Sequence, residues 1–124
     1  MTSEFVHLHN HSDYSLLDGA QRVDQLVDTI DDLNMDSLAL TEHGNMFSVV
    51  PFYNQAKNTG IKPIIGCETY VAVGSRHNKK PPASGGWGNN HLILLVQNQS
   101  GYQNLMKLVT AGYLEGFYYR PRID

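Results

Sequence analysis

The chain has 124 residues, of which 41% are hydrophobic and 17% charged, and a formal net charge of -3, as is typical of one soluble globular domain. It contains no apolar run near the roughly 20 residues that a bilayer crossing requires, and no basic segment followed by an apolar one at its N-terminus, which argues against a membrane or an exported protein. The single cysteine, Cys67, cannot form an internal disulfide, so we expect a cytoplasmic protein.

The charges are divided unevenly between the two halves of the chain. Residues 1–50 carry nine acidic side chains and one basic side chain, giving -8, whereas residues 51–124 carry eight basic and three acidic ones, giving +5. An acidic half that also carries histidines suits metal ions, and cations of the second half could meet phosphates. For each of these cations taken alone, ordinary solvated surface is an equally good explanation. They are Arg76, Lys79, Lys80, Arg120 and Arg122.

The first predicted unit is a strand followed by a helix. Residues 5–8 are apolar and β-prone, and they lead directly into three histidines at alternate positions. From residue 22 to residue 34 the apolar side chains recur at the spacing of one helix face. They are Val23, Leu26, Val27, Ile30 and Leu33.

Strand and helix then alternate again with few residues between them. Residues 37–41 predict a buried strand, residues from about 48 to 59 a helix, and residues 61–66 a third strand. Ser48 can cap the helix and Gly60 can end it. This alternation predicts parallel βαβ units and therefore an α/β fold.

The pattern changes after residue 74. Residues 75–90 are rich in Gly, Pro, Asn and basic side chains, and they predict a flexible surface loop. Residues 91–96 predict a strand, and Ser100 caps a third predicted helix. The aromatic and basic C-terminal end predicts no further helix or strand.

Metal-binding residue types follow the ends of the first three predicted strands. His9 and His11 follow the first, His43 follows the second and Glu68 follows the third. In parallel sheets and barrels the functional side chains gather at the C-terminal ends of the strands, so we expect these residues to converge. The His-x-His pair alone is weak evidence, but with Asp18, His43 and Glu68 it suits zinc, manganese or iron. Without a thiolate cluster, a catalytic site is favoured over a structural zinc site.

Three long stretches of the chain carry a family resemblance. They are FVHLHNHSDYSLLDGA (5–20), ALTEHGNMFSVVPFYNQAKNTGIKPIIGCETYVA (39–72) and GYQNLMKLVTAGYLEGFYYRPRID (101–124). They resemble the N-terminal PHP (polymerase and histidinol phosphatase) domain of the bacterial C-family replicative polymerases, the DNA polymerase III alpha subunits. SLLDGA and YLEGFYY separate this resemblance from the PHP phosphatases.

The resemblance implies that residues 1–124 are the front part of a distorted (β/α)7 barrel. We expect about three to four βα units, with the polymerase palm, fingers and thumb absent from this chain. A complete barrel needs roughly 200 residues or more, so an exposed sheet edge is expected. We expect either a shortened chain, a partner segment absent from this chain, or self-association along that edge.

The resemblance also implies a metal centre that holds up to three divalent ions, with zinc, manganese or iron as candidates. Its ligands match six positions of this chain, out of the nine that a complete site uses. Five of them, all except His91, would act in catalysis through the bound metals. The six ligands are His9, His11, Asp18, His43, Glu68 and His91.

Three positions depart from the simplest pattern. His7 falls where many family members have an aspartate. We expect it to contact and orient the ligands, or to have a structural role, more than to bind the metal directly. Glu42 replaces a usual aspartate, so its longer side chain shifts its hydrogen bond to the site. His91 begins its strand, so it reaches the other ligands only if that strand runs antiparallel or the ligand lies on an incoming loop.

Other reactive residue types have simpler explanations. Cys67 is expected to be a small buried residue, and His77 to be solvated. Asp13 and Tyr14 could line the cleft, although loop hydrogen bonding explains Asp13 equally well. The aromatic residues 117–119 suggest packing against a neighbouring domain more than stacking on bases.

The resemblance implies a metal-dependent 3'-5' exonuclease that proofreads the primer end of DNA. The alternative is an inactive PHP domain that scaffolds the polymerase or docks a separate exonuclease. A free-standing PHP phosphoesterase or an amidohydrolase fits the C-terminal stretch less well. The implied partners are DNA, the other polymerase domains and replisome subunits, with no membrane, and we expect this segment alone to be inactive.

Overall fold

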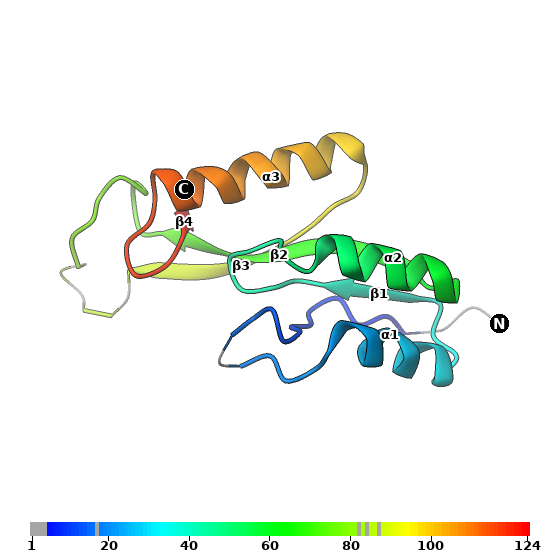
Figure 1. The fold of residues 1–124 in the computed structure, drawn as a ribbon. Coiled ribbons are helices and arrows are strands. Elements are labelled where there is room, and N and C mark those ends of the chain that lie inside the picture. Colours follow the sequence, from blue (N-terminus) through cyan, green and yellow to red (C-terminus); the bar gives the residue numbers. More distant parts are fainter. Residues whose placement is uncertain (1–4, 17, 82, 84, 87) are drawn as a thin grey trace.

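The structure is a computed structural model that describes residues 5–16, 18–81, 83, 85–86 and 88–124 (Figure 1). The SLLDGA stretch and the predicted loop thus include positions outside the described residues, namely Leu17, Pro82, Ser84 and Trp87. The elements follow in the order α1 (Val23–Asp32), β1 (Ser37–Leu40), α2 (Val49–Thr59), β2 (Lys62–Ala72), β3 (Asn89–Leu95), α3 (Gln99–Leu114) and β4 (Arg122–Ile123). Within the described residues, none of the helices combines the length and hydropathy that a membrane crossing requires.

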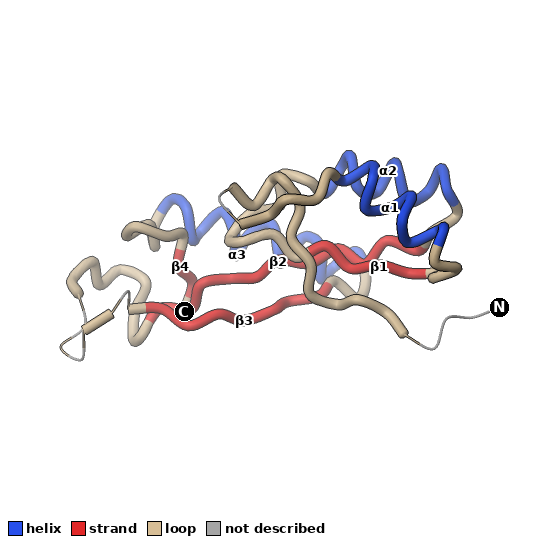
Figure 2. The backbone as a smooth tube through the Cα atoms, turned by 90° about the horizontal axis from the view of Figure 1, so that it is seen from below, coloured by secondary structure: helices blue, strands red, loops and turns tan. Residues whose placement is uncertain are grey.

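The core lies where α1 and α2 pack together against β1 (Figures 1 and 2). The apolar face predicted for the first helix is confirmed, because four of its five residues are buried, whereas Leu33 follows the end of α1 and is exposed. The second predicted helix is confirmed as α2, and Gly60 ends it in the left-handed conformation, with φ +82°. The buried members of the core are Val23, Leu26, Val27, Ile30, Leu38, Leu40, Phe52, Ala56 and Ile61.

The long strand β2 organises the sheet. Residues 62–65 pair in parallel with β1, residues 66–72 pair antiparallel with β3, and residues 70–71 pair in parallel with β4. Gly66 stands where β3 begins to pair, and a Cβ there would lie 2.8 Å from the carbonyl oxygen of Leu94. The predicted parallel unit is present as β1–α2–β2 and the α/β fold class is confirmed. The antiparallel β3 interrupts the βα repeat, so the structure shows a partly open sheet in place of a regular barrel segment.

The N-terminal segment lies beside β1 but is not a strand, so the strand predicted over residues 5–8 is wrong. The backbone N–H of Ala39 donates to the carbonyl of His7, and that of Thr41 donates to the carbonyl of Asn10, both at 2.9 Å. The two donors, Ala39 in β1 and Thr41 directly after it, are two positions apart, whereas their acceptors are three positions apart. This extra residue breaks the regular ladder while still fastening the histidines to the edge of β1.

Two helix starts differ from the predicted caps. Asn98, not Ser100, caps α3, because its side-chain oxygen accepts a hydrogen bond of 2.9 Å from the N–H of Gly101. Ser48 occupies the N-cap position of α2, but its hydroxyl donates to Glu42 and makes no capping bond.

The C-terminal end forms β4, although the sequence predicted no strand there. Its register places Arg122 opposite Tyr70 and Ile123 opposite Val71. Two residues are too few to show an alternating pattern, so the pairing leaves no periodic signal in the sequence.

The basic side chains around this end are bound within the chain. The buried guanidinium of Arg122 donates to the carbonyls of Gly116, Arg76 and Asn78, each at 3.0 Å. Arg76 pairs with Glu115, at 2.8 Å, and with Asp124. Two of the five cations that the sequence offered for phosphates are therefore already partnered inside the protein.

Candidate metal centre

Glu68 is a buried carboxylate surrounded by histidines. Its Oε2 atom lies 2.7 Å from Nε2 of both His9 and His11, and 3.4 Å from Nδ1 of His43. Its Oε1 atom contacts Nδ1 of His91. The expectation that Glu68 follows a strand is wrong, since it lies within β2. Even so, one carboxylate brings together four imidazoles from three other segments.

The environment of Glu68 keeps the carboxylate in its charged form. Burial raises the pKa of this group, but the hydrogen bonds with His9, His91 and His11 and the electrostatic effect of His43 outweigh it. The pKa therefore lies below its ordinary value, and Glu68 is ionised at neutral pH. An ionised carboxylate is the form that binds a metal.

Backbone pairing places His43 beside Glu68. The N–H of Glu68 donates to the carbonyl of Glu42 at 3.0 Å, and the N–H of Gly44 donates to the carbonyl of Glu68 at 2.8 Å. Gly44 has φ +62°, and a Cβ there would lie 2.9 Å from both Tyr70 and Pro121. Glycine is therefore needed directly after His43 to let the chain turn against Tyr70.

A tight loop brings Asp18 close to His43 and His11. The N–H of Ser15 donates to the carbonyl of Ser12, and the N–H of Gly19 to the carbonyl of Ser15, both at 2.9 Å. Asp18 Oδ2 lies 2.6 Å from Nε2 of His43 and 3.8 Å from Nδ1 of His11. The loop thus adds a second carboxylate to the histidine cluster.

The six predicted ligands form three overlapping groups. Within each group the potential ligand atoms lie within 4.8 Å of one another. The Nδ1 atom of His43 is buried and has no hydrogen-bond partner among the described residues. Imidazole nitrogens and carboxylate oxygens are the donors that zinc, manganese and iron accept, so the residues fit divalent metal ions. The groups are His9, His11 and Glu68; His11, Asp18 and His43; and His43, Glu68 and His91.

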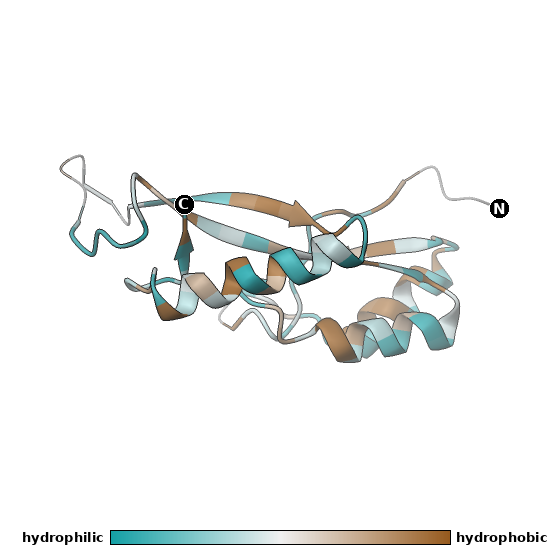
Figure 3. Cartoon of the chain, turned by 90° about the horizontal axis from the view of Figure 1, so that it is seen from above, coloured by the Kyte–Doolittle hydropathy of each residue, from teal (hydrophilic) through white to brown (hydrophobic). Residues whose placement is uncertain are grey.

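His91 reaches the cluster because β3 runs antiparallel to β2, which is one of the two conditions that the sequence set. It pairs with Tyr70, and the two rings meet edge to face with centroids 5.0 Å apart. β3 is hydrophilic at its start, where His91 lies, and hydrophobic towards its end (Figure 3).

Glu42 lies behind the cluster and does not contact its histidine rings. Its buried carboxylate accepts hydrogen bonds from the N–H of Ser12, at 3.1 Å, and from the hydroxyls of Ser12, Ser15 and Ser48. The Ser15 oxygen in turn accepts from the N–H of His43 at 3.0 Å. Glu42 therefore reaches His43 through Ser15. The roles of Ser12 and Ser15, which stand three residues apart within the ligand loop, were not predicted from the sequence.

The structure separates other candidates from the cluster. His7 is exposed, packs edge to face against Phe5, and makes no contact with the six ligands in the described structure. His77 is exposed, as predicted, while Asp13 and Tyr14 line a different hollow. Cys67 is fully buried, which confirms the predicted burial, and this burial raises the pKa of its thiol to about 12.

Comparison with known proteins places the chain in a family. Residues 7–124 match the sequence profile of the PHP domain. The chain belongs to the PHP domain family. This PHP domain is 54% identical over 122 residues to the DNA polymerase III subunit alpha of Borreliella burgdorferi and 51% identical over 120 residues to that of Treponema pallidum. The matches cover 98% and 97% of this chain, and the chain spans about a tenth of the length of these relatives.

Two solved structures share the fold of the PHP domain. An amidohydrolase from Chromobacterium violaceum aligns with a TM-score of 0.56 and 22% identity, over 86% of this chain and 34% of that chain. A protein from Bifidobacterium adolescentis, described as a metal-dependent phosphoesterase, aligns with a TM-score of 0.56 and 14% identity, over 90% of this chain and 35% of that chain. These likenesses support the α/β architecture described above.

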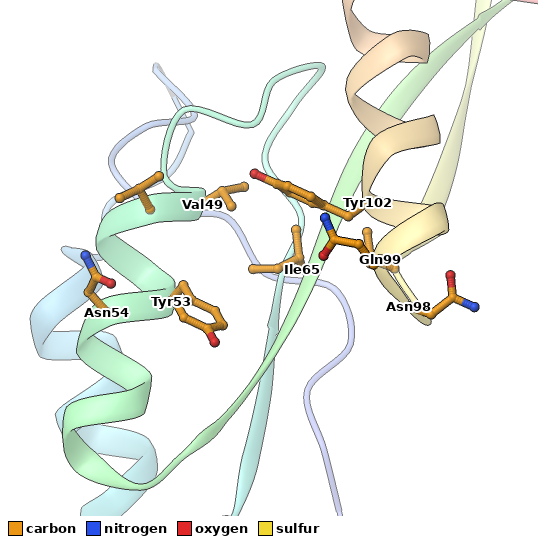
Figure 4. A pocket seen from close by; sticks show the side chains of 9 residues that line it. Val49, Tyr53, Asn54, Ile65, Asn98, Gln99 and Tyr102 are labelled. Atoms are coloured by element: carbon orange, nitrogen blue, oxygen red, sulfur yellow. The ribbon is translucent and has the colours of Figure 1, made fainter.

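A groove of about 360 Å³ lies between α2 and α3 of the PHP domain (Figure 4). Its walls include Val49, Tyr53, Ile65 and Tyr102, and none of the six cluster residues lines it. Its lining offers no carboxylate or imidazole for general acid–base or metal chemistry. The histidine cluster is therefore the better candidate for a reactive centre.

Proposed function

We propose that this PHP domain binds divalent metal ions through its histidine cluster and uses them to hydrolyse phosphodiesters. The observation that carries the proposal is the overlap of three ligand groups, two of which contain Glu68. Carboxylates are the usual bridges between neighbouring ions, and multi-metal sites are typical of phosphoester hydrolysis. The proposed ligands are His9, His11, Asp18, His43, Glu68 and His91.

The exposure of the ligands suits a reactive site more than a structural one. The Glu68 side chain is only 4% exposed, whereas those of His9, Asp18 and His91 are between 51% and 53% exposed. The cluster is therefore anchored at its buried side and open to solvent at the other, as a catalytic metal site must be.

Bound divalent ions would supply Lewis-acid stabilisation of the phosphate and a water molecule of lowered pKa. The contribution of the chain is to hold the ligands in place. Glu68 stays ionised, Asp18 is held by the turn at Ser15, and His43 is fixed through its backbone on both sides. Such fixed side chains present donor atoms without reorganisation when a metal or substrate arrives.

We further propose that the parent protein is a DNA polymerase III alpha subunit and that the reaction is 3'-5' removal of a nucleotide at the primer end. The relatives that match nearly the whole chain carry that name, which supports the proposal. Its substrate is then the terminal phosphodiester of DNA, and its partners are the other polymerase domains and replisome subunits. An inactive scaffold would be expected to have lost ligands, and all six expected ones are present.

The test compares the full-length polymerase subunit with its His9→Ala variant. His77→Ala is the matched control, because His77 is exposed and lies outside the cluster. We expect His9→Ala to lower the bound metal, measured by mass spectrometry, and to lower the rate of excision from a mismatched primer at least tenfold. If the wild-type protein binds no transition metal, or if excision is equal in all three proteins, the proposal is wrong.

A further inference from the structure

Arg120 lies beside the histidine cluster, and both contact the same residue, Tyr70. Its Nη1 atom donates to the hydroxyl of Tyr70 at 2.8 Å, and its guanidinium carbon lies 5.1 Å from the centre of the Tyr70 ring. The buried ring of Tyr70 stacks against His43 and meets His91 edge to face. Tyr70 therefore contacts both a cation and two candidate metal ligands.

Arg120 differs from the other arginines of the described structure in having neither a carboxylate nor a carbonyl partner. Arg22 pairs with Asp24, Arg76 pairs with two carboxylates, and Arg122 binds three carbonyls. A guanidinium has five N–H donors, and the bond to Tyr70 uses one of them. Arg120 is an exposed residue, and its guanidinium thus has donors available to an anion.

A small hollow lies between Arg120 and the cluster. It has a volume of about 150 Å³, and its lining residues are Tyr70, Asn89, His91 and Arg120. That volume corresponds to roughly five water molecules, which is enough for a phosphate group. It is below the roughly 300 Å³ at which pockets begin to hold drug-sized ligands, so it is too small for a nucleoside.

The backbone turn before Arg120 determines where Arg120 lies. Tyr119 has φ +58°, which is unusual for a bulky side chain, and the N–H of Tyr118 donates to the carbonyl of Arg120 at 3.0 Å. Such strained positions persist where neighbouring structure holds them, and they gather at ligand sites. Directly after the turn, Pro121 packs against Gly44 and Arg122 enters β4. Arg120 is therefore presented by a turn that is anchored on both sides.

We propose that Arg120 binds a phosphate group of the substrate in this hollow and so places the phosphodiester against the metal cluster. The planar guanidinium matches two phosphate oxygens, which a lysine at the same place could not match. The reaction context rests on the proposed function. Binding of phosphate by Arg120 is a separate property that the metal-free chain can show.

The first test titrates inorganic phosphate into the metal-free chain by calorimetry, at pH 8, above the ordinary pKa of histidine. Arg120→Gln should weaken binding about tenfold or more, and Arg120→Lys should restore part of it. Arg22→Gln is the matched control, because Arg22 is an exposed arginine that pairs with Asp24, and it should bind like the wild type. Circular dichroism verifies that each variant is folded. Equal affinity in Arg120→Gln, or no saturable binding by the wild type, would overturn the proposal.

The second test separates this inference from the proposed function. In the metal-loaded full-length subunit, Arg120→Gln should raise the KM for primer excision about tenfold and change kcat less, because a binding contact is lost. If the wild type excises nothing while Arg120→Gln still abolishes phosphate binding, the proposed function fails and this inference stands. If excision occurs with the same KM in Arg120→Gln, this inference fails and the proposed function stands.

Discussion

Replacement of Glu42 by alanine should destabilise the protein more than any exposed carboxylate change. Four donors lose their acceptor, namely the N–H of Ser12 and the hydroxyls of Ser12, Ser15 and Ser48. Hydrogen bonds to a charged group contribute about 1.5–3 kcal/mol each, but the desolvation of the buried carboxylate offsets part of this, and the hydroxyls can turn to new partners. We expect a net loss of about 3–5 kcal/mol in the free energy of unfolding, or a melting temperature lower by roughly 10–15 °C.

The assay is thermal and urea unfolding followed by circular dichroism, with a chelator present so that metal binding does not contribute. Asp31→Ala removes an exposed carboxylate on α1 and should change the free energy of unfolding by less than about 0.5 kcal/mol. Ser48→Ala removes one of the four donors and should lower it by about 1 kcal/mol. The amide resonance of His43 should also shift in Glu42→Ala, because Ser15 connects the two residues. A loss below about 1 kcal/mol in Glu42→Ala would refute this reasoning.

Two further predictions concern groups outside the metal cluster. Burial raises the pKa of Cys67 to about 12, so only about one thiol in ten thousand is ionised at pH 8. Iodoacetamide should therefore label Cys67 far more slowly in the folded chain than in the urea-unfolded chain. Equal labelling rates would contradict this prediction. The N–H and guanidinium of Arg76 hold the pKa of Asp124 below its ordinary 3.8. These contacts therefore stabilise the folded state fully above pH 3.8, and this stabilisation is lost as the pH falls through the lowered pKa of Asp124. The difference in melting temperature between the wild type and Arg76→Gln should therefore shrink below about pH 3.8, and a constant difference would count against the ion pair.

The sequence predicted the local elements well where a periodic pattern existed. The apolar spacing from Val23 to Ile30 identified α1, and Gly60 identified the end of α2. The segment at residues 5–8 had a strand-like composition, but its register against β1 is broken by an extra residue. Composition cannot reveal such a register, because it depends on which atoms of a distant segment are available for pairing.

The sequence identified the candidate ligands by their residue types. It did not show which strands and hydrogen-bond partners surround them. Glu68 interrupts an apolar run, which made it look like the end of a strand, yet the strand continues and takes β3 as its partner from Gly66 onward. The partners of Glu42 are two serines of the distant N-terminal loop, Ser12 and Ser15, and Ser48 six positions further along the chain, and a serine carries little signal of its own. Arg122 looked like a surface cation because nothing nearby in the sequence shows that three carbonyls will surround it.

The wide separation of the cluster residues along the chain affects when the site can exist. His9 lies 59 positions before Glu68, and His91 lies 23 positions after it. Contacts between such distant positions form slowly, because the intervening loops must close before any contact is gained. The donor atoms therefore come together only after the N-terminal segment, β1, β2 and β3 have all paired. Tight metal uptake should consequently mark the last step of folding, and refolding followed by metal-sensitive fluorescence would time the completion of this sheet.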